Sequence, residues 1–261
     1  MKVSLIITTY NSPELLDKVV RSSLFQIRLP DEVIIADDGS DDITAAAVQQ
    51  FFKVSPVPMF HVWQEKRGFR AAKIRNEAIK QSSGDYIVLL DGDCVVNRHF
   101  IADHISLAEK GYFIQGKRVH ISRDAVSKFN HRSVNSTKAL CGMVFRGEIS
   151  NIHHLVRLPH SPCIRNRRLR GIKSCNMSFF RQDIIAVNGF NEDFVEWGNE
   201  DSELACRFFR YGLRMKLNNF MAVCFHLWHP TNKTFTNVTQ KLLEATLASK
   251  EYVCKNGLAK L

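Results

Sequence analysis

Short apolar runs alternate with amphipathic stretches along the first 110 residues. The apolar runs are rich in β-branched residues, as buried strands are, and the stretches between them carry apolar residues at helical spacing. This alternation predicts βαβ units, and therefore an α/β fold with a mostly parallel sheet flanked by helices. The expected strands are 3–9, 31–36, 60–63 and 86–90, and the expected helices are 13–24, 42–52 and 71–81. Ser12 could cap the first helix, and Pro13 suits its first position.

The pattern weakens from about Gly111 onward. Residues 122–173 are polar and only weakly periodic, and so long an irregular region is more often a functional lid than a structural necessity. The elements expected in this part are a strand at 113–119, a returning strand at 174–180, a short helix at 183–187, a helical pattern within 192–211, a strand at 222–225 and a surface helix in the tail 238–261.

Acidic residues follow directly after the most apolar of the expected strands. Asp91 and Asp93 are two residues apart, so in an extended segment they point the same way. Gly92 lets the backbone approach a ligand closely or turn sharply. Two carboxylates at the carboxyl end of a strand suit Mg²⁺ or Mn²⁺ carrying a phosphate, and an ordinary Asp-Gly turn is the alternative.

Two further strands also end in polar residues, namely Thr8-Thr9-Tyr10-Asn11 and Asp37-Asp38-Gly39-Ser40. Because ligands of open α/β sheets bind beyond the carboxyl ends of the strands, we expect the three segments to converge on one acidic crevice. The sequence has no G-x-G-x-x-G after its first strand and no G-x-x-x-x-G-K-[ST] motif. Rossmann dinucleotide enzymes and P-loop NTPases are therefore disfavoured.

The composition is that of a globular protein, with 45% hydrophobic and 24% charged residues. The sequence shows neither a signal peptide nor an apolar stretch long enough to span a bilayer. The seven cysteines have no C-x-x-C spacing, which predicts free, mostly buried thiols in a reducing cytosol. The net charge of +10 favours anionic partners. The densest basic run is 165–173, either a solvated loop or a contact for a phosphate, an acidic acceptor or a lipid headgroup.

Taken in order along the chain, these motifs resemble glycosyltransferase family 2, the nucleotide-sugar-dependent transferases of GT-A type. The residues that carry the resemblance are 3–11, 36–40, Gly68, Arg75-Asn76 and 91–93. Residues 188–192 and 197–203 are similar to the second half of β-1,4-galactosyltransferases and of bacterial chondroitin-polymerase-like enzymes. The resemblance implies a single GT-A domain. It would comprise a nucleotide-sugar-binding half (1–110), an acceptor half (111–236) and a helical tail (237–261).

The resemblance also implies a role for each residue of the expected donor site. The family usually binds uracil, and a carboxylate can accept a hydrogen bond from the ring N–H of this base. The family also binds a divalent cation, which neutralises the charge on the leaving diphosphate. Arg75 would lie near the phosphates, with a surface position on its helix as the alternative. Thr8, Tyr10 and Asp37 would hold the nucleobase, Asp38 would support the nucleoside or its loop, Asp91 would touch the ribose or a metal-bound water, Gly92 would lie in the donor site, and Asp93 would bind the metal.

The second acidic cluster would act on the acceptor. By the resemblance, Asp201 is the general base, and Glu200 orients the acceptor or shares this task. Trp197 would form an apolar floor for a sugar ring, unless it belongs to the core. Glu203 could instead simply complement a helix dipole. Ser202 stands where galactosyltransferases often have another acid, which leaves the acceptor contacts there open.

A late histidine would complete the metal shell. The segment 226–230 contains two, and His226 is favoured because the expected strand before it could deliver its side chain to the crevice, with His229 as the fallback. Imidazole suits Mn²⁺ better than Mg²⁺.

These features together predict a metal-dependent, inverting glycosyltransferase that moves a hexose or N-acetylhexosamine from a UDP-sugar to a surface-glycan or lipid-linked acceptor. UDP-galactose and UDP-N-acetylgalactosamine are the favoured donors. The enzyme is expected in the cytoplasm, with the basic run contacting the anionic inner face of the membrane, and it is not expected to bind nucleic acid. The alternatives are a sugar-nucleotide nucleotidyltransferase and a non-enzymatic basic module that binds nucleic acid or carbohydrate, although acids at three strand ends would repel a phosphate backbone.

Overall fold

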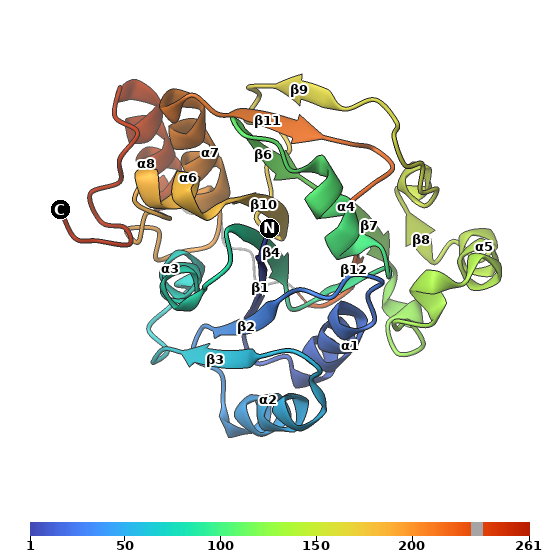
Figure 1. Ribbon diagram of the computed structural model, residues 1–261. Helices are drawn as coiled ribbons and strands as arrows, with labels where there is room; N and C mark the ends of the chain where they lie inside the picture. Colours follow the sequence, from blue (N-terminus) through green and yellow to red (C-terminus); the bar gives the residue numbers. More distant parts are fainter. Residues whose placement is uncertain (231–236) are drawn as a thin grey trace.

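Two β-sheets form the centre of the computed structural model, which describes residues 1–230 and 237–261. Within these ranges, the strands of the larger sheet are β1 (Val3–Thr9), β2 (Glu32–Asp37), β3 (Met59–Trp63), β4 (Tyr86–Asp91), β6 (Tyr112–Gln115), β9 (Ile164–Asn166), β10 (Asn176–Phe180) and β11 (Arg214–Leu217). The strands of the smaller sheet are β5 (Cys94–Val96), β7 (Lys117–Ile121), β8 (Ile149–Ser150) and β12 (Val223–Leu227). Their orders are β3-β2-β1-β4-β10-β6-β11-β9 and β5-β12-β7-β8 (Figure 1).

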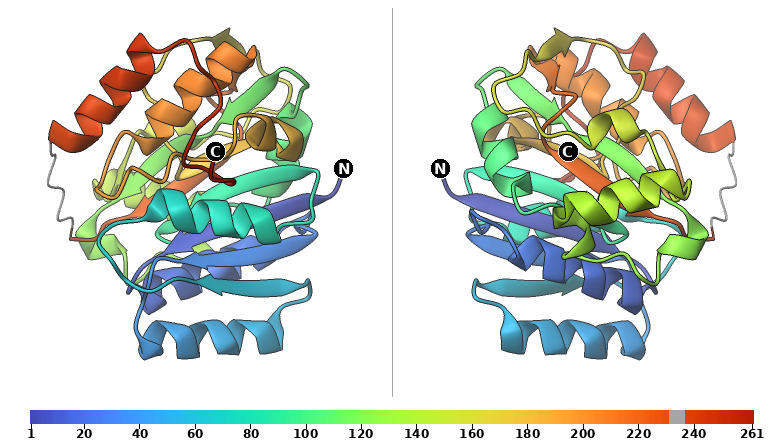
Figure 2. Two further views of the ribbon diagram at one scale, coloured as in Figure 1. Left: turned by 90° about the vertical axis from the view of Figure 1, so that its left-hand side faces the viewer. Right: turned by 90° about the vertical axis from the view of Figure 1, so that its right-hand side faces the viewer.

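Helices cover both faces of the larger sheet (Figure 2). The helices in the described ranges are α1 (Pro13–Leu24), α2 (Asp42–Val54), α3 (Ala71–Gln81), α4 (Phe100–Leu107), α5 (Thr137–Phe145), α6 (Arg181–Ala186), α7 (Glu200–Tyr211) and α8 (Asn237–Ala248). Strands β1 to β4 run parallel, and β10 pairs antiparallel with β4. The predicted mostly parallel sheet flanked by helices is therefore confirmed. In the described part of the chain, no helix has the length and apolarity that crossing a membrane would require.

The apolar core is divided by the larger sheet. Along β1, Leu5 and Ile7 face a cluster that includes buried residues of α1 and α2, whereas Ile6 faces a second cluster with α3 and α7. Successive side chains of a strand point to opposite faces, so a strand packed on both faces must be apolar throughout. This packing holds β1 and β4 side by side in the middle of the sheet, with Thr8 opposite Asp91.

The single strand expected at 113–119 is wrong, because the segment divides at Gly116 between the two sheets. The Gly116 N–H donates to the carbonyl oxygen of Asn176 at 3.0 Å. A Cβ at position 116 would overlap the Asn176 side chain, so the close approach of the two segments requires glycine. Gly116 therefore turns the chain from one sheet into the other.

Other local expectations are corrected in detail. Ser12 precedes α1 without capping it, because its hydroxyl donates to the carbonyl of Tyr10 at 3.1 Å; Pro13 occupies the first turn as expected. The segment 122–173 is more ordered than expected, since it contains α5, β8, β9 and short 3₁₀ helices. The tail helix ends at Ala248.

All seven cysteines are free thiols, as predicted. Strands from both expected halves share the larger sheet, and the expected boundary at residue 236 lies outside the described residues.

Candidate active site

A cavity of about 740 Å³ opens beyond the carboxyl ends of β1 and β4. Its walls come from segments far apart in the sequence. The ends of β2, β1 and β4 are adjacent because the sheet order places β1 between β2 and β4. The residues predicted for the site that line this cavity are Thr8, Tyr10, Asp38, Arg75, Asp91, Gly92, Asp93, Trp197, Glu200, Asp201, His226 and His229. The strand ends thus converge as the topology predicts.

A carboxylate and two imidazoles meet on one wall of the cavity. Asp93 Oδ2 lies 2.9 Å from Nε2 of His229 and 3.4 Å from Nε2 of His226. The pairing of β12 with β5 causes this meeting, because it sets His226 opposite Cys94, beside Asp93. Although burial opposes it, hydrogen bonds from the two histidines hold the pKa of Asp93 below its usual range.

The three ligand atoms lie within 4.8 Å of one another, a spacing that suits a single divalent cation. One oxygen and two imidazole nitrogens fit Mn²⁺ better than Mg²⁺, which prefers an all-oxygen shell. The sequence offers His226 and His229 as alternative ligands, and the structure brings both to Asp93. Asp91 is not part of this cluster.

Arg75 forms a buried network that joins the two acidic clusters. Its Nη2 lies 3.1 Å from Asp91 Oδ1, its Nη1 lies 3.1 Å from Glu200 Oε1, and its Nε donates to Thr8 Oγ1 at 3.3 Å. The Arg75 side chain is only 4% exposed, so the alternative of a surface position on α3 is wrong. Burial, together with Asp93 and Glu200, raises the pKa of Asp91, and Arg75 counters them.

Asp37, the last residue of β2, and Asp38, which follows it, have different environments, and Asp37 does not reach the cavity as its predicted nucleobase contact would require. Asp37 is fully buried and does not line the cavity; its carboxylate accepts from the Ser40 N–H at 2.8 Å and lies 3.0 Å from His61 Nε2. Asp38 lines the cavity while accepting from the Arg70 N–H at 2.9 Å. The physical reason is the strand alternation, which turns Asp37 into the protein where it holds the loop.

Asp201 stands at the start of α7, on the wall formed by the second acidic cluster. Its carboxylate accepts from the Ser202 N–H at 2.7 Å and from the Ser174 N–H at 3.4 Å. Burial, reinforced by the charge of Glu200, raises the pKa of Asp201 to about 7. A carboxyl group with this pKa can take up a proton near neutral pH, which is what a general base requires.

Glu203 lies apart from the cavity. It forms a buried, two-pronged ion pair with Arg207 one turn further along α7, with distances of 2.8 and 2.7 Å. Glu203 therefore has a structural role, and its main interaction is the ion pair with Arg207 rather than the helix dipole.

Sequence reasoning missed one wall of the cavity, formed by Arg118 and the segment 172–175. The basic run, for which a phosphate or acceptor contact was one of the expectations, contributes Lys173 to this wall, but its pattern gives no sign of which of its cations line the cavity. Arg118 lies within a segment that was expected to be one ordinary strand.

Two family models match the chain. One, described as glycosyl transferase family 2, matches residues 4–180, and one described as the N-terminal domain of galactosyltransferase matches residues 158–230. The first match covers well over half of the sequence, so the chain belongs to glycosyltransferase family 2. The resemblance seen in the motifs is thereby confirmed.

Curated relatives include the hyaluronan synthase of Pasteurella multocida, 27% identical over 225 residues, which cover 80% of this chain and 23% of that protein. The chondroitin synthase of Escherichia coli is 24% identical over 265 residues, which cover 93% of this chain and 38% of that protein. The chain therefore spans well under half the length of these two relatives.

Solved structures share the fold. S. aureus TarS 1–349 in complex with UDP-GlcNAc superposes with a TM-score of 0.67 at 17% identity, over 95% of this chain and 66% of that one. GalNAc-T7 with UDP, GalNAc and Mn²⁺ gives a TM-score of 0.70 at 12% identity, over 95% and 47%. These likenesses confirm the predicted GT-A fold.

Proposed function

We propose that the protein is a metal-dependent, inverting glycosyltransferase that moves a hexose or N-acetylhexosamine from a UDP-sugar to a glycan or lipid-linked acceptor. The observation that carries this proposal is the shared cavity, which has the cluster Asp93, His226 and His229 on one wall and Asp201 on another. UDP-N-acetylhexosamines are attractive donors because TarS was solved with UDP-GlcNAc and GalNAc-T7 with UDP and GalNAc.

In this proposal, Asp93, His226 and His229 hold a divalent cation, most favourably Mn²⁺. When bound, the cation would neutralise the charge that develops on the leaving diphosphate. Asp91 is held by Arg75 at the same end of the sheet, where it can meet the ribose of the donor.

Asp38, rather than Asp37, is proposed to contact the nucleobase, together with Thr8 and Tyr10. All three line the cavity, and Tyr10 is 44% exposed, with Lys66 Nζ 3.4 Å from the centre of its ring. Asp37 would act indirectly by fixing the loop that carries Asp38.

Asp201 is proposed to take the proton of the acceptor hydroxyl as its oxygen attacks the anomeric carbon. The bond from that carbon to the diphosphate oxygen breaks, UDP leaves, and attack from the opposite side inverts the configuration. Glu200 is bound to Arg75, so we assign it the orientation of the acceptor side of the cavity and leave the base function to Asp201 alone. Trp197, on the same wall, would contact a sugar ring.

The proposal is tested by measuring UDP release from a panel of UDP-sugars with Mn²⁺ or EDTA, in the presence and absence of candidate acceptors. Asp93→Ala should lose Mn²⁺-dependent UDP binding. Asp201→Asn should keep UDP binding but lose transfer by about 10²- to 10⁴-fold, the usual contribution of a general base.

Asp124→Asn is the matched control, because Asp124 is exposed and does not line the cavity. It should behave as the unmodified protein. Full transfer by Asp201→Asn would refute the assignment of the base, and the absence of Mn²⁺-dependent binding or turnover of every UDP-sugar would refute the proposed function.

A further inference from the structure

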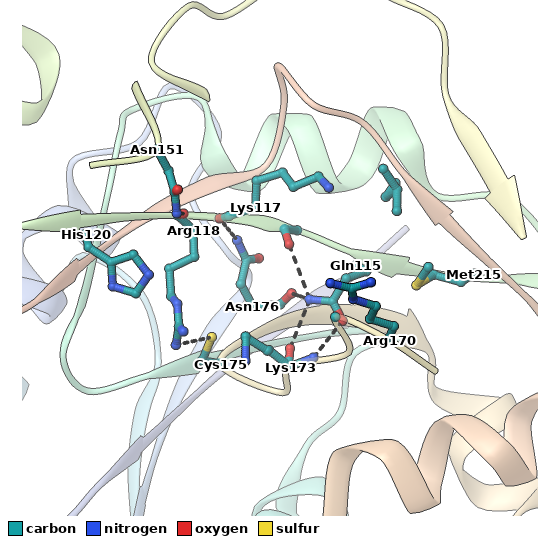
Figure 3. Close-up of a pocket in the computed structure, with 13 residues that line it drawn as sticks. Gln115, Lys117, Arg118, His120, Asn151, Arg170, Lys173, Cys175, Asn176 and Met215 are labelled. Atoms are coloured by element: carbon teal, nitrogen blue, oxygen red, sulfur yellow. Dashed lines mark hydrogen bonds between the residues drawn. The ribbon is translucent and has the colours of Figure 1, made fainter. Parts of the chain in front are cut away.

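A second, smaller pocket of about 210 Å³ lies beside the cavity; we call it the basic pocket. At roughly 30 Å³ per water, it has room for about seven water molecules or a polar group of similar size. Figure 3 shows its lining, which comes from β6, β7, β10, β11, the segment 170–175 and Asn151 after β8. Strands of two sheets and two connecting segments therefore build this pocket.

Four cationic side chains line the basic pocket: Lys117, Arg118, Arg170 and Lys173. No carboxylate lines it among the residues that the structure describes, and none of the four cations belongs to an ion pair there. Arg118 Nε is also buried, and it has no hydrogen-bond partner among the described residues. Burial is the sole cause that lowers the pKa of Lys117. Clustered positive charges repel one another, so the arrangement is suited to an anion that would bind between them.

Hydrogen bonds keep the basic pocket rigid. Gln115 accepts from the Lys173 N–H at 2.9 Å and donates to the Lys173 carbonyl at 3.0 Å, which fixes the backbone of the basic run. Asn176 donates to the carbonyl of Lys117 at 3.0 Å, and Asn151 to that of Arg118 at 3.1 Å. The backbone of the pocket is therefore fixed before an anion binds, which removes the cost of ordering the chain on binding.

The basic pocket borders the acceptor side of the cavity. Arg118, Lys173 and Cys175 line both spaces, and the N–H of Ser174, between the latter two, points to Asp201. A group in the basic pocket would thus lie next to a sugar whose hydroxyl faces Asp201.

We infer that the basic pocket binds an anionic group of the acceptor, a carboxylate or a phosphate, and that the enzyme therefore prefers acidic acceptors. This inference rests on the proposed function, because it assigns the acceptor side through Asp201. Arg170 and Lys173 are exposed yet line the basic pocket, which also gives part of the basic run 165–173 a role beside the active site.

The competing assignment is that these cations bind the diphosphate of the donor. The structure separates the two cases, because Lys117 and Arg170 line only the basic pocket, whereas Arg118 and Lys173 also face the cavity. The double variant Lys117→Met/Arg170→Ser therefore tests the basic pocket without altering the cavity wall. Arg214→Ser is the control, since Arg214 is an exposed arginine at the start of β11 that lines neither space.

The probes are glucuronate, inorganic phosphate and glucose, each titrated by ligand-observed NMR into protein saturated with UDP and Mn²⁺. UDP occupies the donor site, so an anionic probe can report on the basic pocket alone. One of the anions should bind at least about tenfold more tightly than glucose, and the double variant should lose about tenfold of that affinity, whereas Arg214→Ser should lose none. Preference for glucuronate would indicate an acidic sugar, and preference for phosphate a phosphorylated acceptor.

The inference is overturned if both anions bind no better than glucose, or if the double variant weakens UDP binding and leaves anion binding unchanged. Failure of the unmodified protein to bind UDP with Mn²⁺ would instead contradict the proposed function. In that case, titration without UDP still tests the basic pocket.

Discussion

Replacing Arg75 with methionine tests the buried network that joins the two acidic clusters. The change removes a guanidinium that is 4% exposed and that lies 3.1 Å from both Asp91 and Glu200, whose side chains are 31% and 9% exposed. Breaking a buried ion pair by removing one partner costs about 3–5 kcal/mol, because the remaining charge stays desolvated. Asp91 is partly open to water, so we expect a loss near the lower end, about 3 kcal/mol in the free energy of unfolding.

The assay is urea unfolding followed by far-UV circular dichroism, without donor or metal, with the free energy obtained by linear extrapolation. Arg21→Met is the matched control, because Arg21 pairs with Asp17 at 2.8 Å but is 60% exposed. Exposed pairs of this kind contribute at most about 0.5 kcal/mol. Adding Glu200→Gln to Arg75→Met should recover part of the loss, since it removes one of the two unpaired carboxylates.

A loss for Arg75→Met no larger than that for Arg21→Met would refute the reasoning. It would mean that the carboxylates are as well solvated as surface acids when Arg75 is absent. An unchanged stability in the double variant relative to Arg75→Met would show that Glu200 does not depend on Arg75.

Four further predictions concern the site and the fold. Burial, reinforced by Glu200 and opposed by Arg75 and Lys173, raises the pKa of Asp201 to about 7. Because the base is the carboxylate form, kcat/KM should rise as the pH increases through about 7. A flat profile between pH 6 and 8 would contradict this assignment. His226→Ala and His229→Ala should each raise the Mn²⁺ concentration needed for half-maximal UDP binding, and an effect of only one would restrict the ligand set to that histidine. Gly116→Ala should destabilise the protein by about 1–3 kcal/mol in urea unfolding, because its Cβ overlaps Asn176, whereas Gly147→Ala, at a position with open space, tests the cost of a left-handed backbone alone. If the basic run contacts membranes, Arg167→Ser/Arg168→Ser should weaken flotation with anionic vesicles, and unchanged flotation would exclude that contact.

Local patterns along the chain are sufficient to predict the framework of the site. Strands β1 to β4 and helices α1 to α3 follow from local periodicity, since each pattern has one face or both faces to bury, whereas β5 and α4 were not predicted. The position of Asp91 and Asp93 after a buried strand, and the topology of βαβ units, were sufficient to predict that three strand ends converge. These inferences depend on short-range patterns, which a single sequence displays directly.

Which side chains meet depends on the packing of segments that are far apart in the sequence. Arg75 and Glu200 are 125 positions apart, and the helix pattern around Arg75 is equally compatible with a surface position. The presence of both histidines at Asp93 depends on the pairing of β12 with β5, and the basic pocket depends on the break at Gly116. That Asp37 turns into the protein, while Asp38, itself buried, lines the cavity, depends on where β2 ends. Such contacts are fixed by how whole elements pack and by where strands end, and residue periodicity carries no record of either.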